Sequence, residues 1–85
     1  MSVKILYFAR LREAIGHASE PLDLPAGVAT VADVRTLLVA RGGAYADALG
    51  ATKSVRVAVN QDMAEPRTAV RDGDEIAFFP PVTGG

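Results

Sequence analysis

The sequence predicts an α+β fold in which a mixed β-sheet packs on one main helix. Segments with strand-like alternation lie on both sides of a single long helical segment, residues 30–41. This order lacks the repeated crossovers that a doubly wound α/β fold needs. The layout is that of a β-grasp, and a chain of 85 residues is the size of one small domain. We expect the domain to span residues 1–79 and a tail to span residues 80–85.

Residues 3–9 predict the first strand, because they are rich in β-branched and aromatic side chains. Alternation assigns them to two faces, with Val3, Ile5 and Tyr7 on one and Lys4, Leu6 and Phe8 on the other. Both faces of this strand are therefore partly apolar.

A short helix and an edge strand are expected next. Residues 9–15 predict the helix, since apolar residues recur four positions apart and Gly16 follows as a stop. Residues 19–24 alternate weakly, and Pro21 restricts any strand here to a sheet edge or to the positions beyond the proline. The chain thus begins with a loose hairpin.

The main helix is expected to begin at Thr30. Thr30 and Asp33 resemble a capping box in which Asp replaces the commoner Glu. The apolar stripe that follows consists of Val31, Val34, Leu37 and Leu38. Two glycines at 42–43 end the helix, and residues 44–49 predict one further helical turn.

The C-terminal half predicts three more strands. Residues 55–60 alternate cleanly, with three valines inward, so we expect a central strand there. Residues 63–70 contain a proline and show little periodicity, which predicts a short irregular strand. Asp72 and Gly73 are a strong turn signal, and residues 75–79 predict the last strand.

The chain ends in a segment suited to presenting its own carboxylate. Pro80 and Pro81 lack N–H donors and hold the backbone extended, so they cannot continue a central strand and should direct the tail away from the domain. Gly84 and Gly85 have no Cβ, so their backbone fits a channel too narrow for other residues. Six extended residues reach roughly 20 Å, which is enough to enter a partner's active site.

Composition excludes several classes of protein. The net charge of −1, from nine basic and ten acidic residues without a basic run, disfavours a nucleic-acid or membrane-surface binder. The absence of Cys removes disulfides, thiolate nucleophiles and Cys-based metal sites. No signal-peptide core or bilayer-length apolar run is present, so we expect a cytoplasmic protein.

A catalytic site within this chain alone is hard to assemble. His17, the only histidine, fits a solvated turn better than a catalytic group. Asp72, Asp74 and Glu75 match no Ca²⁺-loop spacing, and we expect them to form turns and to hold no metal. Residues 50–54 lack the glycine that a phosphate-binding loop requires before its lysine. We therefore expect no bound cofactor, and any nucleotide chemistry on the terminal carboxylate must come from a second protein.

Three outward apolar side chains indicate a partner surface. Phe8 and Phe79 fall on the faces opposite the inferred core, and Met63 lies on the short element between their strands. Together they predict one exposed apolar patch beside the departing tail. The alternative is that the twist of a small sheet covers them.

The end of the chain, residues 78–85, resembles the C-terminal signature of the small subunit of molybdopterin synthase, the MoaD-type sulfur carriers with a ubiquitin-like β-grasp fold. The resemblance continues through the chain in order, at residues 3–16, 30–35, 58–61 and 72–75. Residues 42–53 follow the family only loosely, so no function is carried onto them.

The resemblance implies that the chain is no catalyst alone but carries sulfur on Gly85. An E1-like adenylating enzyme would use ATP and Mg²⁺ to form an acyl-adenylate there, and a sulfur donor would convert it to a thiocarboxylate. In a heterotetrameric synthase, the tail would enter the large subunit and donate sulfur to cyclic pyranopterin monophosphate. The implied tail residues are Pro80, Pro81, Val82, Thr83 and Gly84, and the implied partner-interface residues are Phe8, Arg12, Met63 and Phe79.

Other functions stay open at this point. Within the same fold, the chain could supply sulfur for thiamine or cysteine synthesis, or act as a ubiquitin-like modifier joined to lysines. In a different class, it could be a noncovalent β-grasp adaptor whose glycine end is incidental, since terminal residues are often merely disordered. A thiocarboxylate on Gly85 would distinguish the sulfur carriers from the adaptor.

Overall fold

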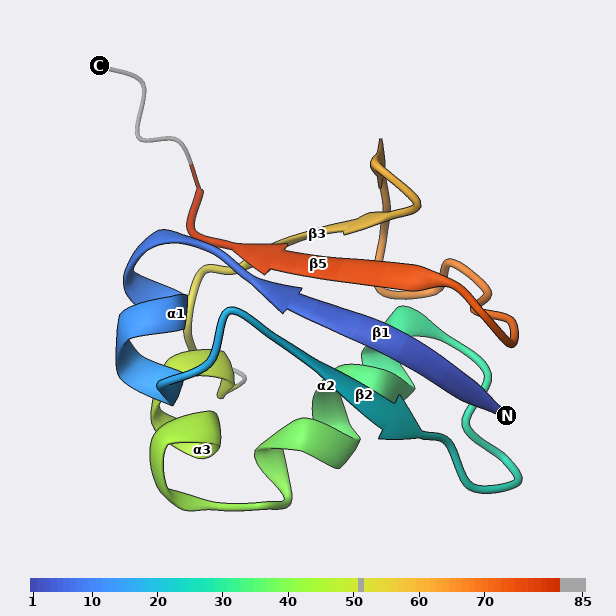
Figure 1. Ribbon diagram of the computed structural model, residues 1–85, viewed down its shortest axis with the longest axis horizontal. Helices are drawn as coiled ribbons and strands as arrows, with labels where there is room; N and C mark the ends of the chain where they lie inside the picture. Colours follow the sequence, from blue (N-terminus) through green and yellow to red (C-terminus); the bar gives the residue numbers. More distant parts are fainter. Residues whose placement is uncertain (51, 82–85) are drawn as a thin grey trace.

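Five strands form one mixed sheet in the computed structural model, which describes residues 1–50 and 52–81. The strands are β1 (Ser2–Tyr7), β2 (Ser19–Asp23), β3 (Arg56–Val59), β4 (Asp62–Met63) and β5 (Glu75–Phe79). The helices are α1 (Ala9–Ile15), α2 (Val31–Val39) and α3 (Gly43–Leu49). Figure 1 shows α2 and α3 together on one side of the sheet, while α1 lies at the end where β1 and β5 finish. The architecture is the predicted α+β class with one main helix.

The sheet order is β2-β1-β5-β3-β4, which places β5 at the centre. β5 pairs in parallel with β1 and antiparallel with β3. β2 lies at the edge, as Pro21 predicts, and pairs antiparallel with β1. β3, predicted to be central, lies between β5 and the two-residue β4. The last strand of the chain, which leads into the tail, is therefore paired with a strand on each edge.

The core fills the space between the sheet and the helices. The inward residues of β1, predicted from alternation, are almost wholly covered: Val3, Ile5 and Tyr7. Ile76 and Phe78 of β5 lie beside them in the same cluster, with Val57 of β3. The helices contribute Leu11, Ile15, Val31, Val34, Leu38 and Leu49. The outward faces of β1 and β5 are therefore not covered by the helices.

The capping box of α2 forms as predicted. Asp33 N–H donates to Thr30 Oγ1 at 3.3 Å, and Thr30 N–H donates to Asp33 Oδ2 at 3.1 Å. The predicted helix end at Arg41 is two residues too late, because regular α-helix stops at Val39 and a tighter turn follows to Gly42. Helix α3 begins one residue before the predicted segment, at Gly43.

Replacing Thr30 with Ala is expected to lower the free energy of unfolding by about 1 kcal/mol, because an N–H of the first turn of α2 loses its acceptor. Urea unfolding measures the change. Thr36→Ala is the matched control, since Thr36 is exposed within α2 and Ala is the better helix former. Equal destabilisation by the two substitutions would contradict a specific role of the cap.

Asp72 and Asp74 lie in the turn before β5, where their carboxylates accept backbone hydrogen bonds. Gly73 has φ 85°, a left-handed conformation that glycine adopts without strain. Asp72 Oδ1 accepts from Ser2 N–H at 2.8 Å, and Asp74 Oδ2 accepts from Arg71 N–H at 2.7 Å. The prediction of turn-forming carboxylates is confirmed for Asp72 and Asp74, while Glu75 is the first residue of β5. In the described part of the chain, no helix has the length and apolarity to cross a membrane.

Candidate functional site

The end of β5 is where the tail leaves the sheet. Phe78 is 1% exposed, and its ring stacks on Tyr7 with 6.4 Å between ring centroids. Phe8 N–H donates to Phe78 O at 3.1 Å, so the pairing of β1 with β5 continues one residue beyond the end of β1. Pro80 and Pro81 are half-buried after the strand. The base of the tail is thus held on the central strand of a closely packed sheet.

The remaining predicted tail residues are Val82, Thr83, Gly84 and Gly85, and they lie outside the described residues. Their roles stay predictions. What the structure supplies is their starting point, at the end of the sheet that carries α1 (Figure 1).

An outer face of the sheet surrounds this starting point. The register places Leu6, Ala77, Ala58 and Met63 in one row across β1, β5, β3 and β4. Phe79 pairs with Arg56 in the next row. Because Tyr7 and Phe78 point into the core, the residue that follows each of them, Phe8 and Phe79, belongs to the opposite, outer face. We call this surface the outer face, and it consists of Leu6, Phe8, Arg56, Ala58, Met63, Ala77 and Phe79.

The predicted interface residues are open to solvent or half-covered. Phe8 is 45% exposed and Met63 is 56% exposed, and both are large apolar side chains. Phe79 is half-buried, so the predicted patch includes a partly covered aromatic ring. Arg12 is exposed on α1, four residues after Phe8, the N-cap of that helix, and this spacing places the two on one side of the helix start. All four side chains can therefore contact a partner.

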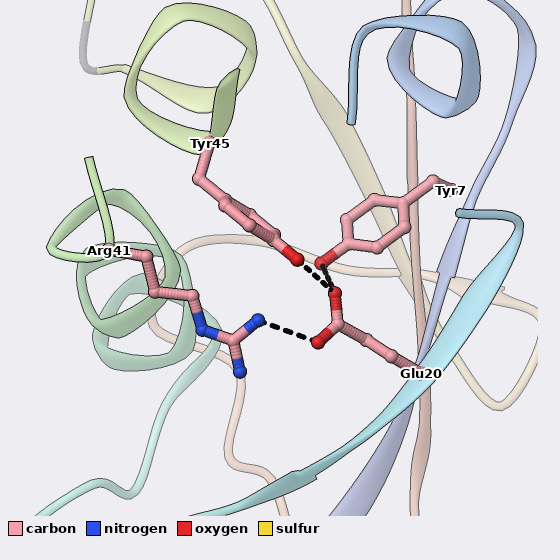
Figure 2. Close-up of polar contacts among 4 residues, drawn as sticks. All are labelled: Tyr7, Glu20, Arg41 and Tyr45. Atoms are coloured by element: carbon pink, nitrogen blue, oxygen red, sulfur yellow. Dashed lines mark hydrogen bonds and ion pairs between the residues drawn. The ribbon is translucent and has the colours of Figure 1, made fainter. Parts of the chain in front are cut away.

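Four side chains form a polar network on the other side of the sheet (Figure 2). Glu20 of β2 accepts from Tyr7 Oη at 3.0 Å and from Tyr45 Oη at 2.7 Å, while Arg41 Nη1 donates to Oε1 at 2.6 Å. The Arg41 guanidinium also lies 4.9 Å from the centre of the Tyr45 ring. The network joins β1 and β2 to the turn between α2 and α3 and to α3 itself.

The network changes the proton affinity of its members. Burial of the Glu20 carboxyl would raise its pKa, but hydrogen bonds from Arg41, Tyr45 and Tyr7 outweigh burial and lower the pKa. Burial, and then the Glu20 charge, raise the pKa of Tyr7 far above its ordinary value. The hydrogen bond to Glu20 raises the pKa of Arg41. All four groups therefore keep the neutral-pH charges that hold the network together.

The stability that Glu20 contributes is expected to depend on pH. Since its pKa is lowered in the folded state, this contribution is present above the ordinary value near 4.5 and is lost as the pH falls through the folded-state pKa. Glu20→Gln should cost about 1–2 kcal/mol at neutral pH, since it weakens charge-assisted hydrogen bonds. Chemical unfolding at pH 7 and at about pH 3 measures the cost. Glu65→Gln, in an exposed pair with Arg67, is the control. If Glu20→Gln lowered the free energy of unfolding equally at both pH values, the ionised Glu20 carboxylate would not be the source of the stability.

An apolar groove of about 430 Å³ lies between α2 and β3, and sequence reasoning did not find it. It is lined by Val31, Ala32, Arg35, Thr36, Val39, Leu49, Val55, Arg56, Val57, Met63, Ala64, Pro66 and Phe78. Arg35 also fixes the neighbouring loop, because its Nε donates to Leu49 O at 2.7 Å and its Nη2 donates to Gly50 O and Lys53 O at 2.8 and 2.9 Å. The half-buried Arg35 guanidinium thus places a positive charge and hydrogen-bond donors at the C-terminal end of α3, where carbonyl groups lack helical partners.

Within residues 1–50 and 52–81, no group of three or more potential metal-ligating side chains comes together. His17 is exposed in the turn after α1, where the sequence predicts it.

Comparison with known proteins identifies the family of the chain. The model of the ThiS family matches residues 5–85, and the matched segment includes the whole tail. The molybdopterin synthase sulfur carrier subunit of Haemophilus influenzae is 45% identical over 98% of this chain and 99% of its own length. Small archaeal modifier protein 1 of Haloferax volcanii is 31% identical and superposes with a TM-score of 0.78 over 95% of this chain and 98% of that one.

A solved complex has a similar fold. The complex of subunits 1 and 2 of the molybdopterin-converting factor of Helicobacter pylori contains a chain with a TM-score of 0.70, 22% identity and full coverage of both chains. At this identity the likeness concerns the fold, and it confirms the β-grasp layout. The full-length matches at higher identity decide the family: the chain belongs to the ThiS family and, within it, to the molybdopterin synthase sulfur carrier subunits.

Proposed function

We propose that this chain is the sulfur carrier subunit of a molybdopterin synthase and that Gly85 carries the sulfur. The observation that supports this most strongly is a family match that runs from the first strand through the last glycine. The fold provides a reason for the arrangement, since the central strand β5 leads directly into the tail. A carrier needs a rigid body that partners recognise and an end that reaches their active sites.

The chemistry starts at a carboxylate that is ionised at neutral pH and is a poor electrophile. An E1-like adenylating enzyme activates the Gly85 carboxylate with ATP and Mg²⁺, because an acyl-adenylate has a good leaving group. A donor of sulfide-level sulfur then attacks the acyl carbon, AMP leaves, and the new carbon–sulfur bond gives a thiocarboxylate. ATP and Mg²⁺ belong to the partner enzyme, and this chain contributes only the carboxylate that is activated.

The charged tail then enters the large subunit of the synthase, which supplies the catalytic residues for sulfur transfer to cyclic pyranopterin monophosphate. The outer face, with Phe8, Arg12, Met63 and Phe79, contacts that subunit in a heterotetramer. Subunits 1 and 2 of the Helicobacter pylori factor form a protein–protein complex, which supports contact between the two subunits. We place the chain and its partners in the cytoplasm, where ATP is available.

The experiment that tests the proposal is reconstitution of molybdopterin synthesis. The full chain, the adenylating enzyme, ATP, Mg²⁺, a sulfur donor, the large subunit and cyclic pyranopterin monophosphate are combined, and molybdopterin is measured. We expect product only when ATP and this chain are both present. Formation of a thiocarboxylate without molybdopterin would reassign the carrier to another sulfur pathway, such as thiamine or cysteine synthesis.

A second candidate is favoured by one observation, the likeness over almost the full chain to small archaeal modifier protein 1. A modifier would use the same adenylate but would join Gly85 to lysines of other proteins. Lysine-linked conjugates that resist thiol reagents, formed with the adenylating enzyme and a cell extract, would support that function. Their absence alongside molybdopterin formation would leave sulfur transfer as the single use.

A further inference from the structure

The groove between α2 and β3 takes no part in the proposed chemistry of the tail. Its volume of about 430 Å³ falls within the range of clefts that hold a ligand or several side chains of a partner. Most of its lining is apolar, including Val31, Val39 and Val55. The groove therefore has the size and the apolar lining that could accept side chains of a partner.

The walls of the groove are fixed by hydrogen bonds. On one side, the first N–H groups of α2 are satisfied by the segment after β4, since Val31 N–H donates to Thr68 O at 3.0 Å and Ala32 N–H donates to Pro66 O at 2.8 Å. On the other side, Arg35 holds the loop after α3 through three backbone carbonyls. A groove whose walls are already ordered loses little conformational entropy when a partner binds.

The charge of the groove selects the chemistry of its occupant. Among the described residues, the groove is lined by two ionisable side chains, Arg35 and Arg56. No described carboxylate lines it. Arg56 is exposed and forms no salt bridge with any described residue. An apolar groove with a cationic rim favours a segment that combines apolar side chains with carboxylates.

The groove is continuous with the outer face. Arg56 lines the groove and pairs with Phe79, and Met63 lines the groove and lies in the outer-face row with Ala58. A partner that covers Phe79 and Met63 therefore reaches the mouth of the groove without leaving the protein surface. The two surfaces can be covered by one protein.

We propose that the groove receives an apolar segment bearing carboxylates from the large subunit of the synthase, the same protein that covers the outer face; this rests on the proposed function. The segment places its apolar side chains against α2 and its carboxylates beside Arg35 and Arg56. The contact adds affinity away from the tail, so that the body of the carrier stays bound while the tail is positioned.

The test uses Thr36, which is exposed on α2 and lines the groove. Thr36→Glu puts a carboxylate where the occupant's carboxylates lie, and Thr36→Lys introduces a side chain of similar length with the opposite charge. Affinity for the purified large subunit encoded in the same genome is measured by calorimetry. We expect Thr36→Glu to weaken binding by about tenfold or more and Thr36→Lys to weaken it by much less, because like charges repel.

Two controls separate the possible outcomes. Ala44→Glu adds the same charge at an exposed site on α3 outside the groove and should leave binding unchanged. Ala32→Glu, also exposed on α2 and in the groove, repeats the test if Thr36→Glu does not fold. Unchanged binding by the groove variants, while Phe79→Ala weakens binding, would overturn the groove proposal and leave the proposed function intact. No binding by the unaltered chain would overturn both.

Discussion

Deleting Gly85 is expected to abolish sulfur transfer while the fold stays intact. The deletion moves the terminal carboxylate back by one residue, roughly 3.5 Å. Reacting groups must be placed within about 1 Å for productive transfer, so the shortened tail cannot present its carboxylate to either partner's active site. Molybdopterin formation in the reconstituted system measures the loss, which should reach the background without this chain.

The deletion also distinguishes a carrier from an adaptor. Because β5 ends at Phe79, removing residue 85 should leave circular dichroism and the urea midpoint unchanged. Adding one glycine after Gly85 is the complementary change. It moves the carboxylate forward by the same distance, so it should also abolish transfer. A shortened chain that still supports molybdopterin formation would contradict the assignment of sulfur to Gly85.

Replacing Phe79 with Ala is expected to weaken binding to the large subunit by about 2 kcal/mol or more, roughly thirtyfold. Phe79 is half-buried on the outer face, opposite Arg56 and directly before the tail. Aromatic side chains that become fully buried near the centre of an interface supply much of its free energy. Calorimetry with the purified large subunit measures the change.

The control for this substitution is Phe79→Tyr, which keeps the ring and should bind nearly as well as the unaltered chain. Unfolding free energies of both variants are measured in parallel, because a half-buried ring can also support the sheet. Unchanged affinity together with a large loss of stability would show that Phe79 serves the fold and not the partner.

Much of the fold could be predicted because its determinants are local. Alternation in β1 assigns Val3, Ile5 and Tyr7 to the core, and all three are covered. The Thr30 and Asp33 cap forms as expected, since a capping box depends on two residues three positions apart. The exposure of Phe8 and Met63 also follows from strand alternation and turn position. Phe8 was therefore predicted from the same period-two pattern as the core, whereas Met63 was predicted from its place on the short element between two strands.

What the sequence did not predict depends on contacts between distant segments. The parallel pairing of β1 with β5 makes β5 central, and alternation within a strand reports covered faces but not the number of neighbouring strands. The hydrogen bonds of the network join Glu20 to residues 13 to 25 positions away. One signal was present: a tyrosine at an inward strand position, Tyr7, needs a partner for its hydroxyl.

The groove was missed for a related reason. Its lining comes from α2, α3, β3, β4, β5 and the segments next to β3 and β4. Each lining residue, taken alone, has the pattern of an ordinary core or surface position. A concave surface arises only when the helix and the sheet edge are placed relative to one another. The roles of Val82, Thr83, Gly84 and Gly85 stay predictions, supported by the family match through residue 85.

The most direct test of sulfur carriage is the intact mass of the full chain after incubation with its adenylating enzyme, ATP, Mg²⁺ and a sulfur donor. The predicted result is a gain in mass equal to the replacement of one oxygen by sulfur, located by fragmentation at Gly85 and absent without ATP. A chain whose mass stays unchanged in the presence of the active adenylating enzyme would contradict the assignment of this protein as a sulfur carrier.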